Sequence, residues 1–142
     1  MSGGEFDVDV FTTKDRSALM ARIQGKNTKP EILVRRVVHG LGYRYRLHRR
    51  DLPGTPDLTF PRLRKIIFVH GCFWHQHSGC RYAYMPKSNV AFWEQKFSAN
   101  RDRDLTSLRK LRKLGWEVLV VWECEIERTD KLLSRINSFL AG

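Results

Sequence analysis

The segment Lys65-Ile66-Ile67-Phe68-Val69-His70 decides the fold of this chain of 142 residues. Its consecutive apolar side chains must point to both faces of a strand, which is typical of a central strand covered on both sides. A second run of this kind, Val118-Leu119-Val120-Val121, lies within residues 116–122. We therefore predict an α/β domain in which helices flank a small mixed sheet.

Apolar residues at helical spacing predict helices on either side of these strands. The predicted helices cover residues 15–24, the stretch from Thr28 to Gly40, the stretch from Phe92 to Leu111 as one long or two consecutive helices, and the stretch around residues 132–140. Thr28 can cap the second helix, Pro30 fits its first turn, and Glu31 stands where a capping box places a carboxylate.

The remaining strands are predicted to be short. Tyr43, Tyr45 and Leu47 alternate with polar residues, which indicates a half-buried strand. Residues 57–60 form another strand after the Pro- and Gly-containing turn at 52–56. The predicted order is α-α-β-β-β-α-β-α in a single domain covering residues 13–142, preceded by a loose lead-in at residues 1–12.

The charge of the chain indicates its binding partner. Twenty-six Lys and Arg residues against 15 Asp and Glu residues give a net charge of +11. A small domain this basic is expected to bind a polyanion, most commonly nucleic acid. No apolar run approaches the ~20 residues that span a bilayer, and no secretory signal pattern is present. Three cysteines exclude a full disulfide framework and favour a cytoplasmic protein with reduced or metal-bound thiols.

All three cysteines and one histidine form a candidate zinc site. Cys72, His77 and Cys80 lie in the loop after the central strand, and Cys124 follows the second buried strand. Three thiolates and one imidazole complete a tetrahedral zinc shell without an open position, which makes the predicted zinc structural. The alternative is a set of three buried reduced cysteines with a loop histidine.

Polar residues near the ends of neighbouring strands form a candidate catalytic site. Asp57 opens one strand, His70 ends the next, and His75 follows five residues later. A carboxylate suits Mg²⁺, and an imidazole that titrates near neutral pH suits the base that activates water for phosphodiester hydrolysis. Glu31 can cap its helix and still face a metal. Taken singly, Asp57 also fits a turn cap, and each histidine fits a loop or core position.

The dipeptide Phe73-Trp74 lies outside any amphipathic pattern. Exposed aromatic side chains on a basic protein can stack on base pairs or push between them. The alternative is that both rings form a local core under the loop that carries Cys72, His77 and Cys80.

Four motifs carry a resemblance to a known family: Leu52-Pro53-Gly54-Thr55-Pro56-Asp57, Val69-His70-Gly71-Cys72-Phe73-Trp74-His75, Asn100-Arg101-Asp102-Arg103-Asp104, and Gly115-Trp116 with Trp122-Glu123-Cys124. From about Arg16 to Cys124 the chain resembles the very-short-patch (Vsr-type) DNA mismatch repair endonucleases. The resemblance implies a restriction-endonuclease-like fold. It also implies a strand-specific endonuclease that nicks double-stranded DNA 5′ to the thymine of a T·G mismatch.

The resemblance further implies catalytic roles for single residues. Asp57 would bind the catalytic Mg²⁺ together with the main-chain carbonyl of Val69, a position that is often Thr in this motif. Glu31 and His70 would hold metal-bound waters, and His75 would be the general base.

DNA and zinc contacts are implied in the same way. Phe73 and Trp74 would wedge into the base stack beside the mismatch, and Met20 would enter from the minor groove. Lys96 and Asn100 would recognise the mismatch and its surroundings. The implied zinc ligands are Cys72, His77, Cys80 and Cys124, although the two residues between His77 and Cys80 exceed the one found in the shorter family form.

Two other functions compete with mismatch repair. One is a related nickase with a different DNA target, for example in phage defence, and the other is a non-catalytic zinc-stabilised DNA-binding module. The joint presence of Asp57, His70, His75 and Glu31 favours an enzyme. We expect a monomer in the bacterial cytoplasm, associated with the nucleoid, with mismatch-repair proteins and a cytosine methyltransferase system as partners.

Overall fold

The computed structural model describes residues 28–142; the predicted lead-in, the helix at residues 15–24 and Met20 lie outside this range. The elements are α2 (Lys29–Gly40), β1 (Arg46–Leu47), β2 (Leu58–Phe60), β3 (Lys65–His70), α3 (Val90–Lys113), β4 (Glu117–Trp122), the 3₁₀ segment η3 (Glu123–Glu127) and α4 (Thr129–Ala141). Within the described range, no helix is both long enough and apolar enough to cross a membrane.

The four strands form one mixed sheet in the order β1-β2-β3-β4. β2 pairs antiparallel with β1 and β3, whereas β3 and β4 run parallel, with Lys65 opposite Glu117 and His70 opposite Trp122. The start of β2 therefore lies beside the end of β3, and β3 and β4 end together. This topology brings the polar residues at these three strand ends to one edge of the sheet.

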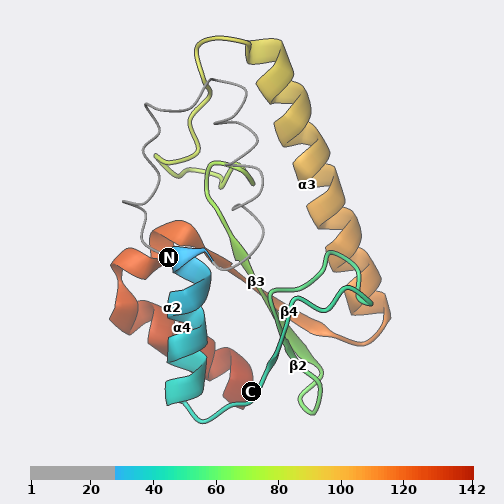
Figure 1. Cartoon of the computed structure of the whole chain (residues 1–142), viewed down its shortest axis with the longest axis vertical. Coiled ribbons are helices and arrows are strands. Elements are labelled where there is room, and N and C mark those ends of the chain that lie inside the picture. Colours follow the sequence, from blue (N-terminus) through green and yellow to red (C-terminus); the bar gives the residue numbers. More distant parts are fainter. Residues whose placement is uncertain (1–27) are drawn as a thin grey trace, which may run out of the picture.

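Helices cover both faces of this sheet, as the buried strand β3 predicted. The prediction that β4 is a second fully buried strand is wrong: β4 lies at the edge of the sheet, and within it only Val121 is buried. In Figure 1, α2 and α4 lie on one side of the strands and α3 lies on the other. Ile67 of β3 packs in the core beneath α2 and α4, and its neighbours Ile66 and Phe68 pack in a second core with Leu111 of α3. The alternation of side chains along β3 thus supplies both cores.

The strand predicted at residues 43–47 is shorter than expected. Tyr43 and Tyr45 do pack against the core, but only Arg46 and Leu47 pair with β2, and Leu47 is 40% exposed. The physical reason is that this is an edge strand, and the left-handed backbone of His48 (φ 48°) ends it.

The region from Phe92 to Leu111 is one continuous helix, which decides between the two arrangements that the sequence left open. Leu105, one of its predicted apolar contacts, is 51% exposed. At 3.6 residues per turn, Leu105 lies about 120° around the helix from the buried Leu111, outside the face that packs on the sheet.

Candidate catalytic and metal-binding site

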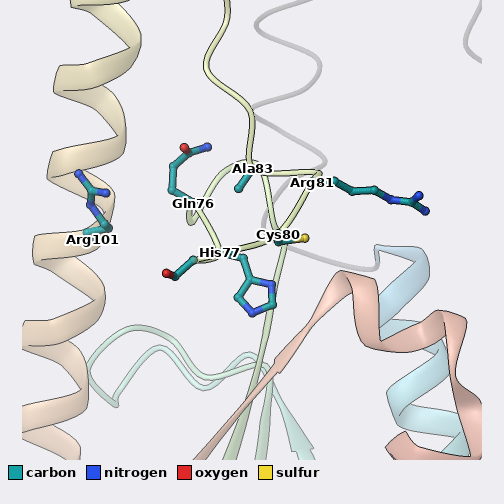
Figure 2. A pocket seen from close by; sticks show the side chains of 8 residues that line it. Gln76, His77, Cys80, Arg81, Ala83 and Arg101 are labelled. Carbon is teal, nitrogen blue, oxygen red and sulfur yellow. The ribbon is translucent and has the colours of Figure 1, made fainter.

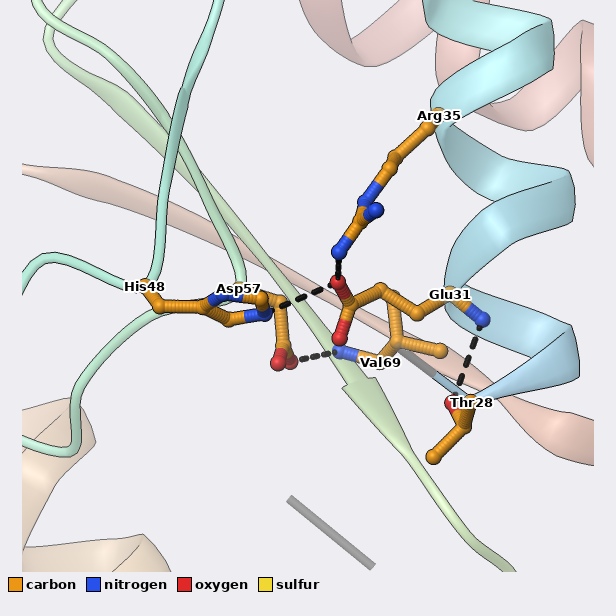
Figure 3. A network of polar contacts seen from close by, with 6 residues as sticks. All are labelled: Thr28, Glu31, Arg35, His48, Asp57 and Val69. Atoms are coloured by element: carbon orange, nitrogen blue, oxygen red, sulfur yellow. Dashed lines mark hydrogen bonds and ion pairs between the residues drawn. The ribbon is translucent and has the colours of Figure 1, made fainter. Parts of the chain in front are cut away.

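Two buried carboxylates and one histidine meet where α2 approaches the sheet. The N–H of Val69 donates to Asp57 Oδ2 at 2.7 Å, and His48 Nε2 lies 2.8 Å from Glu31 Oε2 (Figure 3). Arg35, one helical turn after Glu31, forms an ion pair with the same Glu31 oxygen. One ligating atom from each of Glu31, His48 and Asp57 lies within 4.8 Å of the others, and we call these three residues the carboxylate cluster.

The capping sequence explains how Glu31 reaches this cluster. Thr28 Oγ1 accepts a hydrogen bond from the main-chain N–H of Glu31 at 3.3 Å, as the predicted helix start requires. The Glu31 side chain, which is only 2% exposed, contacts Arg35 and His48. The first turn of α2 therefore holds the carboxylate in the protein interior facing the sheet.

The environment of Asp57 disfavours its charged form. Burial, together with the nearby Glu31 carboxylate, raises the pKa of Asp57 to about 8, although the N–H of Val69 acts in the opposite direction. Two carboxylates facing each other away from water are stabilised by a cation between them. The donor set of the carboxylate cluster therefore fits a divalent cation.

A second group of titratable residues consists of His70, His75 and Asp104. His70 follows Val69 directly and is the last residue of β3. The rings of His70 and His75 stack with centroids 3.9 Å apart and planes 5° from parallel. His75 Nδ1 lies 2.6 Å from Asp104 Oδ2 on α3. Because a carboxylate only accepts, His75 donates through Nδ1, and Nε2 of the neutral ring keeps its lone pair.

His70 remains neutral over the physiological pH range. Burial, together with the neighbouring His75, lowers its pKa to about 3. The stacked pair can therefore accept a proton on His75 without repulsion from a charged His70.

The four predicted zinc ligands lie together. His77 Nδ1 is 3.7 Å from Cys72 Sγ and 3.5 Å from Cys124 Sγ, and the ligating atoms of these three residues and Cys80 lie within 4.8 Å of one another. The N–H of Cys124 donates to Cys72 Sγ at 3.4 Å. This arrangement of three sulfur atoms and one imidazole fits a tetrahedral zinc ion without an open position.

Burial raises the pKa of the Cys72 thiol to about 12, whereas the main-chain N–H of Tyr82 lowers the pKa of Cys80.

The zinc loop, residues 71–89, borders a hollow of about 510 Å³ that His77 and Cys80 line on one side (Figure 2). Arg101 of α3 lies on its other side. A basic side chain thus lies across the hollow from two of the predicted zinc ligands.

Phe73 and Trp74 belong to a cluster of aromatic rings between the zinc loop and α3. The Phe73 ring lies 5.3 Å from Trp74, 5.5 Å from Trp93 and 5.2 Å from Phe97, measured between centroids. Both residues of the dipeptide are half-buried. The two rings pack against neighbouring aromatic side chains, as a local core requires. They also remain partly exposed, as stacking on base pairs requires.

The two predicted DNA contacts on α3 differ in exposure. Asn100 is buried, donates to the Trp74 carbonyl at 3.0 Å, and accepts from Arg103. Lys96, one helical turn earlier, is half-exposed. Asn100 therefore connects α3 directly to the main chain of the aromatic dipeptide.

Sequence reasoning missed three side chains of this site. His48 and Arg35 contact Glu31, and Asp104 contacts His75. A signal for Asp104 existed, because it follows Asn100 by four residues and so lies on the same helical face. His48 carried no comparable local signal.

Comparisons with known proteins identify the family to which the chain belongs. Residues 8–81 match the family described as "DNA mismatch endonuclease Vsr". The chain is 48% identical over 132 residues to "Type II nicking enzyme V.XorIIP" of Xanthomonas oryzae pv. oryzae, covering 93% of this chain and 96% of that protein. It is 37% identical over 139 residues to "DNA mismatch endonuclease Vsr" of Escherichia coli K12, covering 94% of this chain and 88% of that protein.

Proposed function

The chain belongs to the Vsr family of DNA endonucleases, and from this premise we propose that it nicks double-stranded DNA 5′ to the thymine of a T·G mismatch by Mg²⁺-dependent hydrolysis. One observation carries the proposal. The end of β3 serves both halves of the site, because the N–H of Val69 holds Asp57 and the next residue, His70, stacks on His75. A cation-binding carboxylate and a proton acceptor therefore share one strand end.

Asp57 and the main-chain carbonyl of Val69 would hold the Mg²⁺, and Glu31 and His70 would hold its waters. When bound, Mg²⁺ supplies stabilisation of the negative charge that develops on the phosphate. The neutral state of His70 suits its role, since a neutral imidazole can accept a hydrogen bond from water and adds no positive charge near the cation.

His75 would take the proton from the attacking water at Nε2. Asp104 keeps the proton of the neutral ring on Nδ1 and stabilises the imidazolium that forms. We assign Asp104 as a positioning residue for His75, since it acts on the reaction through that ring.

The zinc would be structural. Cys72, His77 and Cys80 come from the loop that carries His75 and the aromatic dipeptide, and Cys124 comes from the segment after β4. A zinc ion in this site ties the loop to the end of the sheet. The mixed sheet, with its antiparallel β1-β2-β3 part and the α3 crossover to β4, supports a restriction-endonuclease-like fold.

Phe73 and Trp74 would unstack the mismatched base step, with Met20, Lys96 and Asn100 completing recognition. The substrate is then a T·G duplex, and the enzyme acts as a monomer at the nucleoid in the bacterial cytoplasm. Mismatch-repair proteins and a cytosine methyltransferase system are its proposed partners.

Nicking of labelled duplexes tests this proposal. Asp57→Ala and His75→Ala should abolish Mg²⁺-dependent nicking of T·G DNA, while Asp51→Ala, an exposed carboxylate outside the cluster, should retain it. Unchanged nicking by the first two variants would contradict the catalytic assignment. Equal cleavage of matched DNA would favour a nickase with another target, and DNA binding without any cleavage would favour the non-catalytic module.

A further inference from the structure

His48 places a nitrogen atom in a cluster whose other donors are oxygens. Its Nε2 lies 2.8 Å from Glu31 Oε2, and the ligating atoms of His48, Glu31 and Asp57 are within 4.8 Å of one another. The side chain is 15% exposed, so it lies mostly inside the protein. The roles described above for Asp57 and Glu31 make no use of this imidazole.

His48 has an unfavourable backbone conformation that its neighbours maintain. Its φ of 48° lies in the left-handed region, which side chains with a Cβ rarely adopt. Its N–H donates to the main-chain carbonyl of Asp57 at 3.2 Å, which fixes the two residues beside each other. Strained conformations of this kind concentrate at functional sites, where the surrounding structure maintains them.

Charge balance argues that His48 does more than neutralise Glu31. Arg35 already provides a positive partner for that carboxylate. The ionised cluster contains two negative charges, so one positive charge from Arg35 leaves an excess that a divalent cation would offset. Because a carboxylate only accepts, His48 Nε2 donates to Glu31 in the ion-free cluster. With the ring proton on Nδ1 instead, the Nε2 lone pair is available to a cation that replaces this hydrogen bond.

We propose that His48 Nε2 is a direct ligand of the divalent cation held by Asp57, and that this nitrogen raises the affinity of the site for Mn²⁺ relative to Mg²⁺. The inference rests on the proposed cation site at Asp57 and adds a ligand and a metal preference to it. Mg²⁺ is bound mainly through oxygen atoms, whereas imidazole nitrogen is a good ligand for transition-metal ions.

Pulsed electron paramagnetic resonance of Mn²⁺ bound to the zinc-loaded protein tests the ligand directly. The wild-type spectrum should show coupling to ¹⁴N that changes when histidine is labelled with ¹⁵N. His48→Gln, which keeps a polar side chain of similar reach, should remove this coupling. A wild-type Mn²⁺ spectrum without nitrogen coupling, or with coupling that His48→Gln retains, would overturn the proposal.

Calorimetric titration with Mn²⁺ alone and Mg²⁺ alone tests the selectivity. His48→Gln should weaken Mn²⁺ binding by about tenfold and weaken Mg²⁺ binding much less, so that the relative affinity for Mn²⁺ falls. Equal weakening of both ions would contradict the selectivity. Asp57→Asn should abolish binding of both ions at this site; if it does not, the proposed function fails at its cation site, whereas loss of the His48 effect alone leaves that function intact.

Discussion

The His75 imidazole is held on two sides by residues of different chemistry. His70 stacks on its face, and the Asp104 carboxylate accepts from Nδ1. The stack fixes the ring plane and the carboxylate fixes the tautomer, so Nε2, the proposed proton acceptor, is oriented before DNA binds. Removal of either contact is therefore expected to affect the rate of hydrolysis more than DNA binding.

Asp104→Asn should lower the nicking rate at saturating DNA by about 100-fold or more, because a neutral amide cannot stabilise the imidazolium. DNA affinity, measured by fluorescence anisotropy, should remain unchanged. Asp102→Asn is the matched control, since Asp102 is an exposed carboxylate on the same helix. Equal rates for the two variants would show that Asp104 does not act on His75.

Asp57 predicts an unusual dependence of stability on pH. Its pKa of about 8 in the folded protein exceeds the ordinary value of 3.8, so folding favours the protonated form. The stability that this group contributes is present below pH 3.8 and is lost as the pH rises through 8. The Mg²⁺-free, zinc-loaded protein should therefore be less stable at pH 8 than at pH 6.

Asp57→Asn should abolish this dependence and stabilise the Mg²⁺-free protein at pH 8 by about 1 kcal/mol or more, because no charge remains to be buried. Urea unfolding of both proteins at pH 6 and pH 8 measures the effect. Asp51→Asn, at an exposed position, should behave as the wild type. A steeper loss of stability in Asp57→Asn than in the wild type would contradict the assignment.

Among the elements, the segment between β1 and β2 shows how closely a loop can pack on a helix. Gly54 has a φ of +79°, and a Cβ built there would lie 2.9 Å from Ser107 Cβ on α3 and 3.1 Å from Phe68 Cζ on β3. Only glycine satisfies both the backbone conformation and the close approach. This contact holds the loop that leads to Asp57 against the second core.

Gly54→Ala should destabilise the protein by about 1–3 kcal/mol, through left-handed strain and overpacking. Gly40→Ala is the matched control, because Gly40 lies in α2 with nothing within 4 Å of an added Cβ, and it should be neutral or stabilising. Thermal unfolding compares the two. Equal melting temperatures would contradict the tight packing at Gly54.

Elements with a strong local pattern were predictable from the sequence, and those set by neighbours were not. Thr28 caps α2 as expected, and β3 has the predicted bounds. The 3₁₀ segment η3 was not predicted, because it depends on Glu125, whose side chain accepts from the N–H of Trp122. His48 joins the site through a left-handed backbone that no periodicity encodes.

At the scale of the whole molecule, the predicted zinc ligands connect segments that are far apart in sequence. Cys124 follows β4, whereas the other three ligands lie in the zinc loop. Trp122 stacks on the His77 ring with centroids 4.1 Å apart and also contacts His70 edge-on at 5.2 Å. The predicted zinc site and the stacked pair of His70 and His75 therefore share Trp122 as a packing neighbour.

Loss of zinc should disorder the zinc loop and abolish nicking, because His75 lies within that loop. Cys124→Ser should reduce zinc content, measured by mass spectrometry, and increase proteolytic cleavage within residues 71–89. Ser78→Ala, at an exposed position in the same loop, should change neither. Full activity in a zinc-free protein would show that the loop holds its shape without the metal.

At the scale of the whole molecule, DNA binding combines an electrostatic contribution that does not depend on base sequence with a contribution specific to the mismatch. The net charge of +11 supplies salt-dependent attraction to phosphates, whereas the aromatic cluster can act only where a base step is opened. Substitutions at Trp74 and Arg101 distinguish these two contributions to binding, because Trp74 belongs to the aromatic cluster and Arg101 is an exposed cation on α3.

Trp74→Ala should reduce the preference for T·G over matched DNA and leave the salt dependence of binding unchanged. Arg101→Gln should weaken binding to both duplexes alike and lower the slope of log K against log salt by about 0.9, the value for one phosphate contact. Affinities of both variants for both duplexes over a range of salt concentrations give the comparison. If Trp74→Ala weakened binding to both duplexes equally, the ring would serve only the local packing seen around Phe73, and discrimination would have to come from other side chains.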